Sequence, residues 1–365
     1  MQSNKGVDKI FLYLACVLLI VGLFILSSAS LGLLVKNKAP ASNLILKQFI
    51  FALFGLFILY FISKIHYKNW KKFSVLIFFI SLGLTALVFI PYLGLTHADA
   101  TRWLKIGSFS FQPAEILKFG FIIYLASWLS SKKSEISSFQ FGFLPFLVMV
   151  GAVALILALQ PDIGTLGIIT ISSGLLFFLG GGRLSQIGII ILLGLSLIFL
   201  LTFLKPYFYL SDRIFVFLNP SIDPQGRGYQ LNQSLIAVGS GKIFGQGFGM
   251  SSQKFNFLPE PTTDSIFSVF TEEFGFAGSL ILISLFFLFF FRGFFIAGRA
   301  PDSFGALLVY GFVILIAVEV FANISAMLGL IPLTGVPLVF ISQGGTALIM
   351  TLAEVGVILN VSRYI

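Results

Sequence analysis

Residues 10–34 open with Ile10-Phe-Leu-Tyr-Leu-Ala-Cys-Val-Leu-Leu-Ile-Val-Gly-Leu-Phe-Ile-Leu26, an uninterrupted apolar run. A helix that crosses a bilayer needs about 20 mainly apolar residues, and this run is long enough. No convincing small-residue cleavage site follows it, so we expect a retained membrane span and not a signal peptide.

Similar runs recur along the whole chain. Its 365 residues are 58% hydrophobic and 10% charged, whereas soluble domains are about 45–50% apolar and about 25% charged. The sequence therefore predicts an all-α, polytopic integral membrane protein that forms a single membrane domain over residues 1–365. We expect about ten spans, at residues 10–34, 46–63, 73–95, 114–130, 141–159, 164–180, 186–204, 265–291, 304–328 and 337–361.

Basic residues concentrate in alternate connections between the spans, which predicts that both termini are cytoplasmic. Lys36 and Lys38, in the first external connection, are a mild exception. The net charge of +9 therefore reflects membrane topology and gives no reason to expect a nucleic-acid partner. The clusters are Lys64, Lys68, Lys71, Lys72, Lys132, Lys133, Arg183, Arg292 and Arg299.

The sequence contains neither a metal-binding motif nor a pair of cysteines that could form a disulfide. Cys16 is the only cysteine and lies inside the first apolar run, so it offers no intramolecular disulfide and no thiolate cluster. His66 and His97 lie in different connections and give no basis for a zinc site.

One long external segment, about 205–264, is polar, rich in glycine and interrupted by prolines. Long loops are usually functional. Its stretch Tyr229–Ala237 has the apolar spacing of a short interfacial helix. The stretch Gly239–Gly249 invites a nucleotide-loop interpretation, but Ile236 and Ile243 stand where that motif needs glycine and serine or threonine. We reject a P-loop and keep a glycine loop that folds over a pyrophosphate or sugar near the membrane surface.

The external segment ends in Leu258-Pro-Glu-Pro-Thr-Thr-Asp264, where an ionisable carboxylate meets the next apolar run. Burial there would raise the pKa of Asp264 towards the range of a general base. Asp264 could equally cap the following helix. The two roles are compatible, and both stay open.

Three further groups carry polar chemistry near the ends of spans. Glu115 and Lys118, after Pro113, share one helical face and are within ion-pair reach, which favours a functional cavity over a structural brace. Asp162 is favoured as the cap of the next helix after a tight turn. Intramembrane Glu272 and Glu319 are favoured as buried hydrogen-bonding struts.

Taken in order, these residues resemble the SEDS family of bacterial cell-wall proteins, to which FtsW and RodA belong. The resemblance covers nearly the whole chain. Its motifs are Arg102-Trp103, Gln112-Pro-Ala-Glu115-Ile-Leu-Lys118, Gln160-Pro-Asp-Ile-Gly-Thr165, Gly228-Tyr-Gln with Gln233-Ser and Gly239-Ser-Gly241, Leu258–Phe267 with Glu272-Glu273, and Gly329–Gly335 with Ser342-Gln-Gly-Gly345.

The resemblance implies a ten-helix peptidoglycan glycosyltransferase of the bacterial cytoplasmic membrane that polymerises lipid II at its outer face. It also implies a class B penicillin-binding transpeptidase and other division or elongation proteins as partners. The segments 28–30, 67–72 and 360–363 look more like division-type FtsW. Gln343 stands where tyrosine is usual and Thr263 where histidine often precedes the aspartate, which puts fine substrate or metal preferences in doubt.

The resemblance implies catalytic roles for Asp264, Glu115 and Lys118. We expect Asp264 to deprotonate an acceptor hydroxyl, and Lys118, Arg102 and Arg213 or Arg227 to balance the leaving pyrophosphate. A divalent Mg or Mn ion is implied by the resemblance alone. The substrate-binding candidates are Arg102, Trp103, Asp162, Arg213, Gln233, Ser234, Lys242, Glu260, Ser342, Gly344 and Gly345.

Two other functions fit parts of the pattern. A lipid flippase would use the same basic cavity but would need no general base. An ion-coupled transporter would need paired broken helices and charges at the membrane midplane, whereas most charged motifs here fall near one face, and no internal repeat is visible.

Overall fold

A computed structural model of the chain describes residues 6–32, 41–97, 100–107, 109–203, 207–219, 223 and 225–365. Lys36 and Lys38, the mild exception to the predicted topology, lie outside the described residues. Within those ranges, nine helices are long and apolar enough to cross a membrane, and α7 is a shorter apolar helix of the same bundle. The predicted all-α, multi-pass membrane fold is confirmed.

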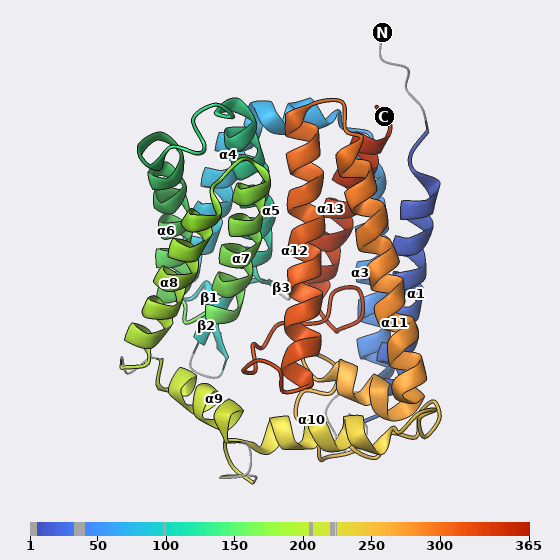
Figure 1. Cartoon of the computed structure of the whole chain (residues 1–365). Coiled ribbons are helices and arrows are strands. Elements are labelled where there is room, and N and C mark those ends of the chain that lie inside the picture. The colour runs from blue at the N-terminus through green and yellow to red at the C-terminus, as the bar shows by residue number, and fades with distance from the viewer. Residues whose placement is uncertain are drawn as a thin grey trace.

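The helices of the bundle run alternately between its two ends, so that α1 begins and α13 ends at the same end (Figure 1). Their bounds are α1 (Lys9–Ser30), α3 (Ala41–Ile62), α4 (Tyr67–Ala86), α5 (Pro113–Ser131), α6 (Leu144–Leu159), α7 (Ile163–Leu179), α8 (Leu184–Leu201), α11 (Ile266–Gly298), α12 (Ser303–Met327) and α13 (Gly345–Ser362).

The centre of the bundle is formed by α5, α12 and α13. Of the residues in the most apolar part of each helix, 72% are buried inside the protein in both α12 and α13 and 67% in α5, but only 17% in α8. Apolar side chains such as Leu192, Leu195 and Phe199 are exposed on α8, as a lipid-facing surface requires. Charged residues on the three central helices are therefore shielded from lipid by other helices.

The other end of the bundle carries the extramembrane elements (Figure 1). They are α9 (Phe208–Leu218), α10 (Tyr229–Ser240) and a three-stranded antiparallel sheet with the order β1-β2-β3. The short helix predicted at 229–237 is confirmed as α10, and its position at the membrane interface stays a prediction. Both α9 and α10 lie across the end of the bundle in Figure 1.

The small sheet was not predicted. Its strands are β1 (Gly94–His97), β2 (Ala100–Ile106) and β3 (Phe109–Phe111). The predicted span 73–95 lies six residues too late at both ends. Helix α4 already begins at Tyr67 and gives way to the 3-10 turn η1 (Leu87–Phe89), and the chain reverses at Tyr92, whose φ is +74°. The sheet matters for the site because β2 carries Arg102 and Trp103.

The last predicted span, 337–361, starts too early. Helix α13 begins only at Gly345, and residues 328–344, here called the 328–344 loop, are irregular. Pro332 and Pro337 cannot donate helical hydrogen bonds, and Phe340 has a φ of +67°. Apolar residues of this loop, such as Leu338 and Ile341, are buried in protein, so its irregular backbone is not exposed to lipid.

Helix α11 is kinked at Gly275, where φ is +66° and ψ is −165°. The glycine loop packs into this kink. The Gln246 amide donates to the Glu272 carbonyl at 3.0 Å, and the Phe276 amide donates to the Lys242 carbonyl at 2.9 Å. A Cβ on Gly275 would come within 2.3 Å of the Gly245 nitrogen, so glycine is required for this close approach. The loop therefore braces α11, and its expected role over a pyrophosphate or sugar stays a prediction.

Candidate active site

Asp264 stands directly before the first turn of α11. The N-cap of α11 is Ser265, without a side-chain capping hydrogen bond, so the capping role considered for Asp264 is wrong. Glu260, in the preceding turn, has a φ of +46°, and the Thr263 hydroxyl donates to its carboxylate at 2.9 Å. Asp264 is half-buried, and its carboxylate does not cap α11.

Arg213 and Asp264 face the same small space beside Gly335. A Cβ added to Gly335 would lie 3.7 Å from the Arg213 Nη2 and 3.7 Å from the Asp264 Oδ2. Gly335 has a φ of +71°, which favours glycine. The Arg213 Nη1 also donates to the Leu333 carbonyl at 2.8 Å, so the 328–344 loop orients this guanidinium from helix α9.

Burial raises the pKa of Asp264 to about 6, and the nearby negative charge of Glu260 adds to the rise. The positive charges of Arg213 and Arg102 act in the opposite direction. Removing a carboxylate from water disfavours its charged form, and cations restore it. A carboxyl group with this pKa is mostly ionised at neutral pH yet accepts a proton more readily than an ordinary aspartate.

Arg102 reaches the site from β2 and is held by the turn before α7. Its Nη1 lies 3.7 Å from the Asp162 Oδ1, and its Nη2 donates to the Pro161 carbonyl. Asp162 is buried, caps α7 and accepts a 2.9 Å hydrogen bond from the Thr165 hydroxyl. The predicted cap is confirmed, and the same carboxylate positions Arg102. Trp103, the next residue of β2, is half-buried.

The backbone around Asp264 is tied to the 328–344 loop by three side chains. Buried Asn323 of α12 donates to the Asp264 carbonyl at 2.8 Å and to the Val336 carbonyl at 2.7 Å. The Ser342 hydroxyl donates to the Thr263 carbonyl at 2.6 Å. The Thr262 hydroxyl donates to the Gln343 Oε1 at 3.0 Å, so the unusual Gln343 has a definite partner.

The far end of the 328–344 loop is fixed by α3. Buried Gln48 donates to the Ser342 carbonyl and accepts from the Gly344 amide, both at 3.3 Å. A Cβ on Gly345 would come within 2.6 Å of the Phe51 ring, so a larger residue at the start of α13 would require the Phe51 side chain to move. Ser342, Gly344 and Gly345 therefore shape the loop that supports Asp264.

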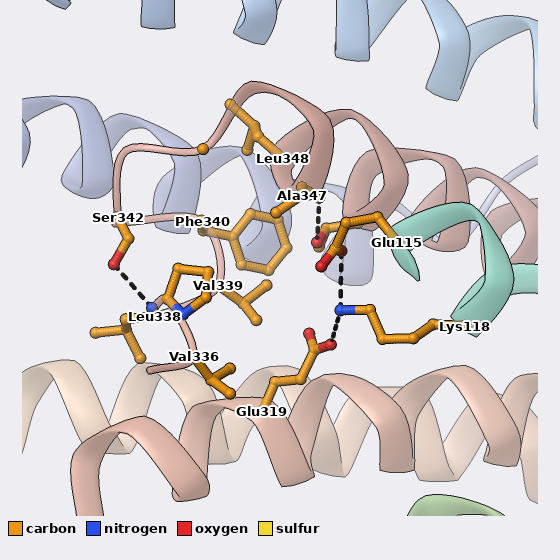
Figure 2. A pocket seen from close by; sticks show the side chains of 13 residues that line it. Glu115, Lys118, Glu319, Val336, Leu338, Val339, Phe340, Ser342, Ala347 and Leu348 are labelled. Atoms are coloured by element: carbon orange, nitrogen blue, oxygen red, sulfur yellow. Dashed lines mark hydrogen bonds and ion pairs between the residues drawn. The ribbon is translucent and has the colours of Figure 1, made fainter. Parts of the chain in front are cut away.

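Glu115 and Lys118 lie in a buried ion cluster behind this loop. The Lys118 ammonium lies 2.8 Å from the Glu115 Oε2 and also pairs with Glu319 of α12. Figure 2 shows the three head groups on one wall of a narrow pocket, with residues 336–342 on the other wall. The predicted pair is confirmed as a contact. Glu319 is the strut that the sequence suggested.

A fourth charged residue, Glu354 of α13, is buried near the same cluster. Two carboxylates thus contact the Lys118 ammonium, which compensates its buried charge, and the third carboxylate lies near enough to interact with the cluster electrostatically. Lys118 is already paired with two of the carboxylates, whereas Arg213 and Arg102 are the cations that act on Asp264.

Four other candidates are placed elsewhere. Ser234 is buried, and its hydroxyl contacts the Met327 sulfur at 3.6 Å. Lys242 is exposed in the glycine loop. Gln233 lines a groove on the outer side of α10. Arg227 pairs with Asp212 at 2.6 Å in an exposed position. The structure does not bring these residues to Asp264.

Several structural side chains were missed from the sequence. Gln48 and Glu354 are single polar residues within apolar runs, and that isolation was the available signal. Lys254 is fully buried and pairs with Glu273 at 2.6 Å, although a lysine in a polar loop suggests exposure. Glu272 accepts hydrogen bonds from Ser251 and Ser252 and is the strut that was expected.

Among the described residues, no group of three or more histidine, cysteine, aspartate or glutamate side chains could hold a metal ion. A Mg²⁺ ion that arrives with phosphate groups needs only one or two protein carboxylates. Asp264 and Glu260 could supply these one or two carboxylates, because both belong to the segment just before α11. Such an ion would supply further positive charge to a leaving pyrophosphate.

The chain matches a family model described as cell cycle protein, of the FtsW, RodA and SpoVE proteins, over residues 8–365. It is 40% identical to stage V sporulation protein E of Bacillus subtilis over 98% of this chain and 97% of that protein. It is 36% identical to a probable peptidoglycan glycosyltransferase FtsW of Geobacter sp. strain M18 over 99% of this chain and 98% of that protein.

Solved structures share the fold over nearly the full length. One is a chain of a peptidoglycan synthase complex studied for its coordination of polymerization and crosslinking, with a TM-score of 0.77, 27% identity and 98% coverage of both chains. Another is the rod shape determining protein RodA of Thermus thermophilus, with a TM-score of 0.72, 25% identity and coverage of 98% of this chain and 97% of that one.

Proposed function

Because the chain belongs to the FtsW, RodA and SpoVE family of cell cycle proteins, we propose that it is a peptidoglycan glycosyltransferase that polymerises lipid II during cell division or elongation. The observation that carries the proposal is the Asp264 carboxylate, half-buried and facing the same space as the Arg213 guanidinium beside Gly335. A base and a cation on one small space suit a reaction that removes a proton and releases an anion.

In the proposed reaction, Asp264 accepts the proton of the acceptor 4-hydroxyl. The hydroxyl oxygen then forms a bond to the anomeric carbon of the donor, with inversion, while the bond from that carbon to the lipid pyrophosphate breaks. The pKa of about 6 suits a group that must be ionised before the step and protonated after it.

The departing pyrophosphate needs positive charge at the outer face. Arg213 and Arg102 are our candidates, because both act on Asp264 electrostatically and each is oriented by a backbone carbonyl. A guanidinium presents several donors to a phosphate group. A Mg or Mn ion held by Asp264 or Glu260 would add to this charge. Lys118 and Glu115 act, in this proposal, by holding the wall behind the 328–344 loop.

The membrane setting follows from the same assignment. We propose that the chain lies in the bacterial cytoplasmic membrane with both termini in the cytoplasm and Asp264 at the outer face. Helix α1 begins and helix α13 ends at the same end of the bundle (Figure 1). Lys64 and Lys132, in the connections at that end, and Arg363, just after α13, give it positive charge, which supports this orientation. The proposed partner is a class B penicillin-binding transpeptidase, together with other division or elongation proteins.

The test is a polymerisation assay with purified protein and labelled lipid II. We expect the wild type to form glycan chains and Asp264→Asn to form none while it is inserted and folded normally, because an amide cannot accept the proton. Asp223→Asn is the matched control, since Asp223 caps a turn in the same outer segment. Transbilayer movement of lipid II without polymer in the wild type would instead identify a flippase, and polymer formation by Asp264→Asn would remove the general base.

A further inference from the structure

A second recess lies outside the site around Asp264, along the outer face of α10. It is an open recess of about 900 Å³, lined by Gln225, Tyr229, Asn232, Gln233, Leu235, Ile236 and Phe257. Pockets for small ligands usually span about 300–1,000 Å³, so this groove is at the upper end of that range. We call it the α10 groove.

One face of helix α10 packs against the bundle, and another face lines the groove. Leu231, Ser234 and Ala237 are buried against the bundle. Tyr229, Asn232, Gln233 and Ile236, at spacings of three, four and seven, line the groove on the other face. The eight residues from Tyr229 to Ile236 extend about 10 Å along the helix axis, a length comparable to one disaccharide unit of a glycan.

The chemistry of the lining is polar and uncharged. Three primary amides and one phenol line the groove, and no lysine, arginine, aspartate or glutamate does, although the chain carries a net charge of +9. A pyrophosphate or an anionic headgroup would be matched by cations. Amides both donate and accept hydrogen bonds, as neighbouring sugar hydroxyl and acetamido groups require, and the exposed ring of Phe257 offers an apolar face for a sugar ring.

The groove is joined to Asp264 through both of its sides. On the α10 side, the Gln230 Nε2 donates to the hydroxyl of Ser265, the neighbour of Asp264, at 3.2 Å. On the other side, Phe257 begins the segment that ends at Asp264, and the next residue, Leu258, is fully buried and anchors that segment. A polymer made at Asp264 could therefore be held by elements that also define the site.

From these observations we propose that the α10 groove binds the neutral sugar backbone of the growing glycan strand and retains it between additions. The inference rests on the proposed function and extends it, because it assigns a product-binding site apart from Asp264. Retention of the strand determines how many sugars are added before the product leaves, so the groove controls product length.

The first arm of the test measures binding directly. Purified wild type is titrated with a peptide-free oligosaccharide of alternating N-acetylglucosamine and N-acetylmuramic acid whose lactyl carboxyl groups are converted to amides, so that the probe is uncharged like the proposed ligand. The variant combines Gln233→Leu with Phe257→Ala, and the matched control combines Gln246→Leu with Phe244→Ala, two exposed residues of the glycine loop. We expect the variant Kd to rise about tenfold or more through the lost hydrogen bond and ring contact, and the control Kd to stay unchanged.

The second arm measures the length of the polymer made from lipid II. We expect the groove variant to make shorter chains than the wild type and the control. Wild-type protein that binds no oligosaccharide, or a variant with unchanged affinity and unchanged chain length, would overturn the inference and leave the proposed function standing. A variant that keeps affinity and length but loses co-purified transpeptidase would make the groove a protein interface, which also overturns it. Absence of any wild-type polymer counts against the proposed function, and the binding arm still decides the groove.

Discussion

The side-chain amide of Asn323 donates a 2.8 Å hydrogen bond to the backbone carbonyl of Asp264 and a 2.7 Å bond to the carbonyl of Val336. One buried side chain of α12 therefore joins the segment that carries the proposed base to the 328–344 loop. The same loop accepts a hydrogen bond from Arg213 at Leu333. The relative positions of Asp264 and Arg213 consequently depend on Asn323, a residue to which the proposed reaction gives no direct contact with the substrate.

The first prediction concerns Asn323. Asn323→Leu keeps the approximate volume but removes both donors and leaves two buried carbonyls unpaired, which costs about 1–3 kcal/mol for each group. We expect a lower Tm and a fall in kcat of about tenfold or more, with a smaller change in KM, because the base moves relative to the cations. Thermal unfolding and lipid II polymerisation, measured on the same preparation, check this. Normal kcat in a destabilised protein would reduce Asn323 to a packing role.

The second prediction concerns pH. Since Asp264 must be ionised to accept a proton and has a pKa of about 6, we expect polymerisation to rise with pH through about 6 and then to level off. The Arg213 charge lowers this pKa and the Glu260 charge raises it. Arg213→Gln should therefore move the profile to higher pH, and Glu260→Gln to lower pH. Shifts in the same direction would contradict the electrostatic assignment.

The outcome for the fold shows what hydropathy can and cannot reveal. Long apolar runs located the spanning helices, and Pro113 marked the start of α5. The same criterion extended the last span back over Pro337–Ile341, because an apolar segment buried as irregular backbone has the same composition as a helix. The turn at Tyr92 and the strands that follow were missed for a related reason, since Leu93 and Leu95 read as the end of a span.

The site was predictable only in part. The position of Asp264 after a Pro-Glu-Pro turn marked it, and the spacing of Glu115 and Lys118 predicted their contact. The partners from distant segments were not predictable, because Glu319 and Gln48 approach the site only through helix packing. Gln343 departs from the motif of the family, and the structure gives its side chain a hydrogen bond from Thr262 that the motif could not predict.

The third prediction separates two roles of Lys118. Removing one partner from a buried ion pair leaves an uncompensated charge, at a cost of about 3–5 kcal/mol. We expect Glu115→Gln and Lys118→Met each to lower the Tm, with Lys118→Met the worse because it leaves both Glu115 and Glu319 unpaired. The triple substitution Glu115→Gln, Lys118→Met, Glu319→Gln should recover much of the Tm.

Activity of that triple variant decides between the roles. If Lys118 only supports the 328–344 loop, polymerisation should return together with the Tm. If Lys118 also meets the pyrophosphate, the Tm should return without polymerisation. Because Lys118 is already held by two carboxylates and Arg213 and Arg102 act on Asp264, we expect polymerisation to return together with the Tm. A variant as unstable as Lys118→Met alone would show that the cluster is not held together by its charges.

The last prediction tests the orientation on which an external active site depends. Met250 and Lys133 are both exposed. Met250 lies in the segment between α10 and α11, and Lys133 lies in the connection between α5 and α6, and these two connections lie at opposite ends of the bundle (Figure 1). In a Cys16→Ser background, we expect Met250→Cys to react with a membrane-impermeant maleimide in cells with an intact cytoplasmic membrane. If the cells have an outer membrane, it is permeabilised first so that the reagent can pass. Lys133→Cys should react only after the cytoplasmic membrane is permeabilised. The dense positive charge of Lys132 and Lys133 favours retention of that connection in the cytoplasm. The reverse labelling pattern would place Asp264 and Arg213 on the cytoplasmic side, where a polymer destined for the cell wall could not be assembled, and would refute the proposed topology together with the external site.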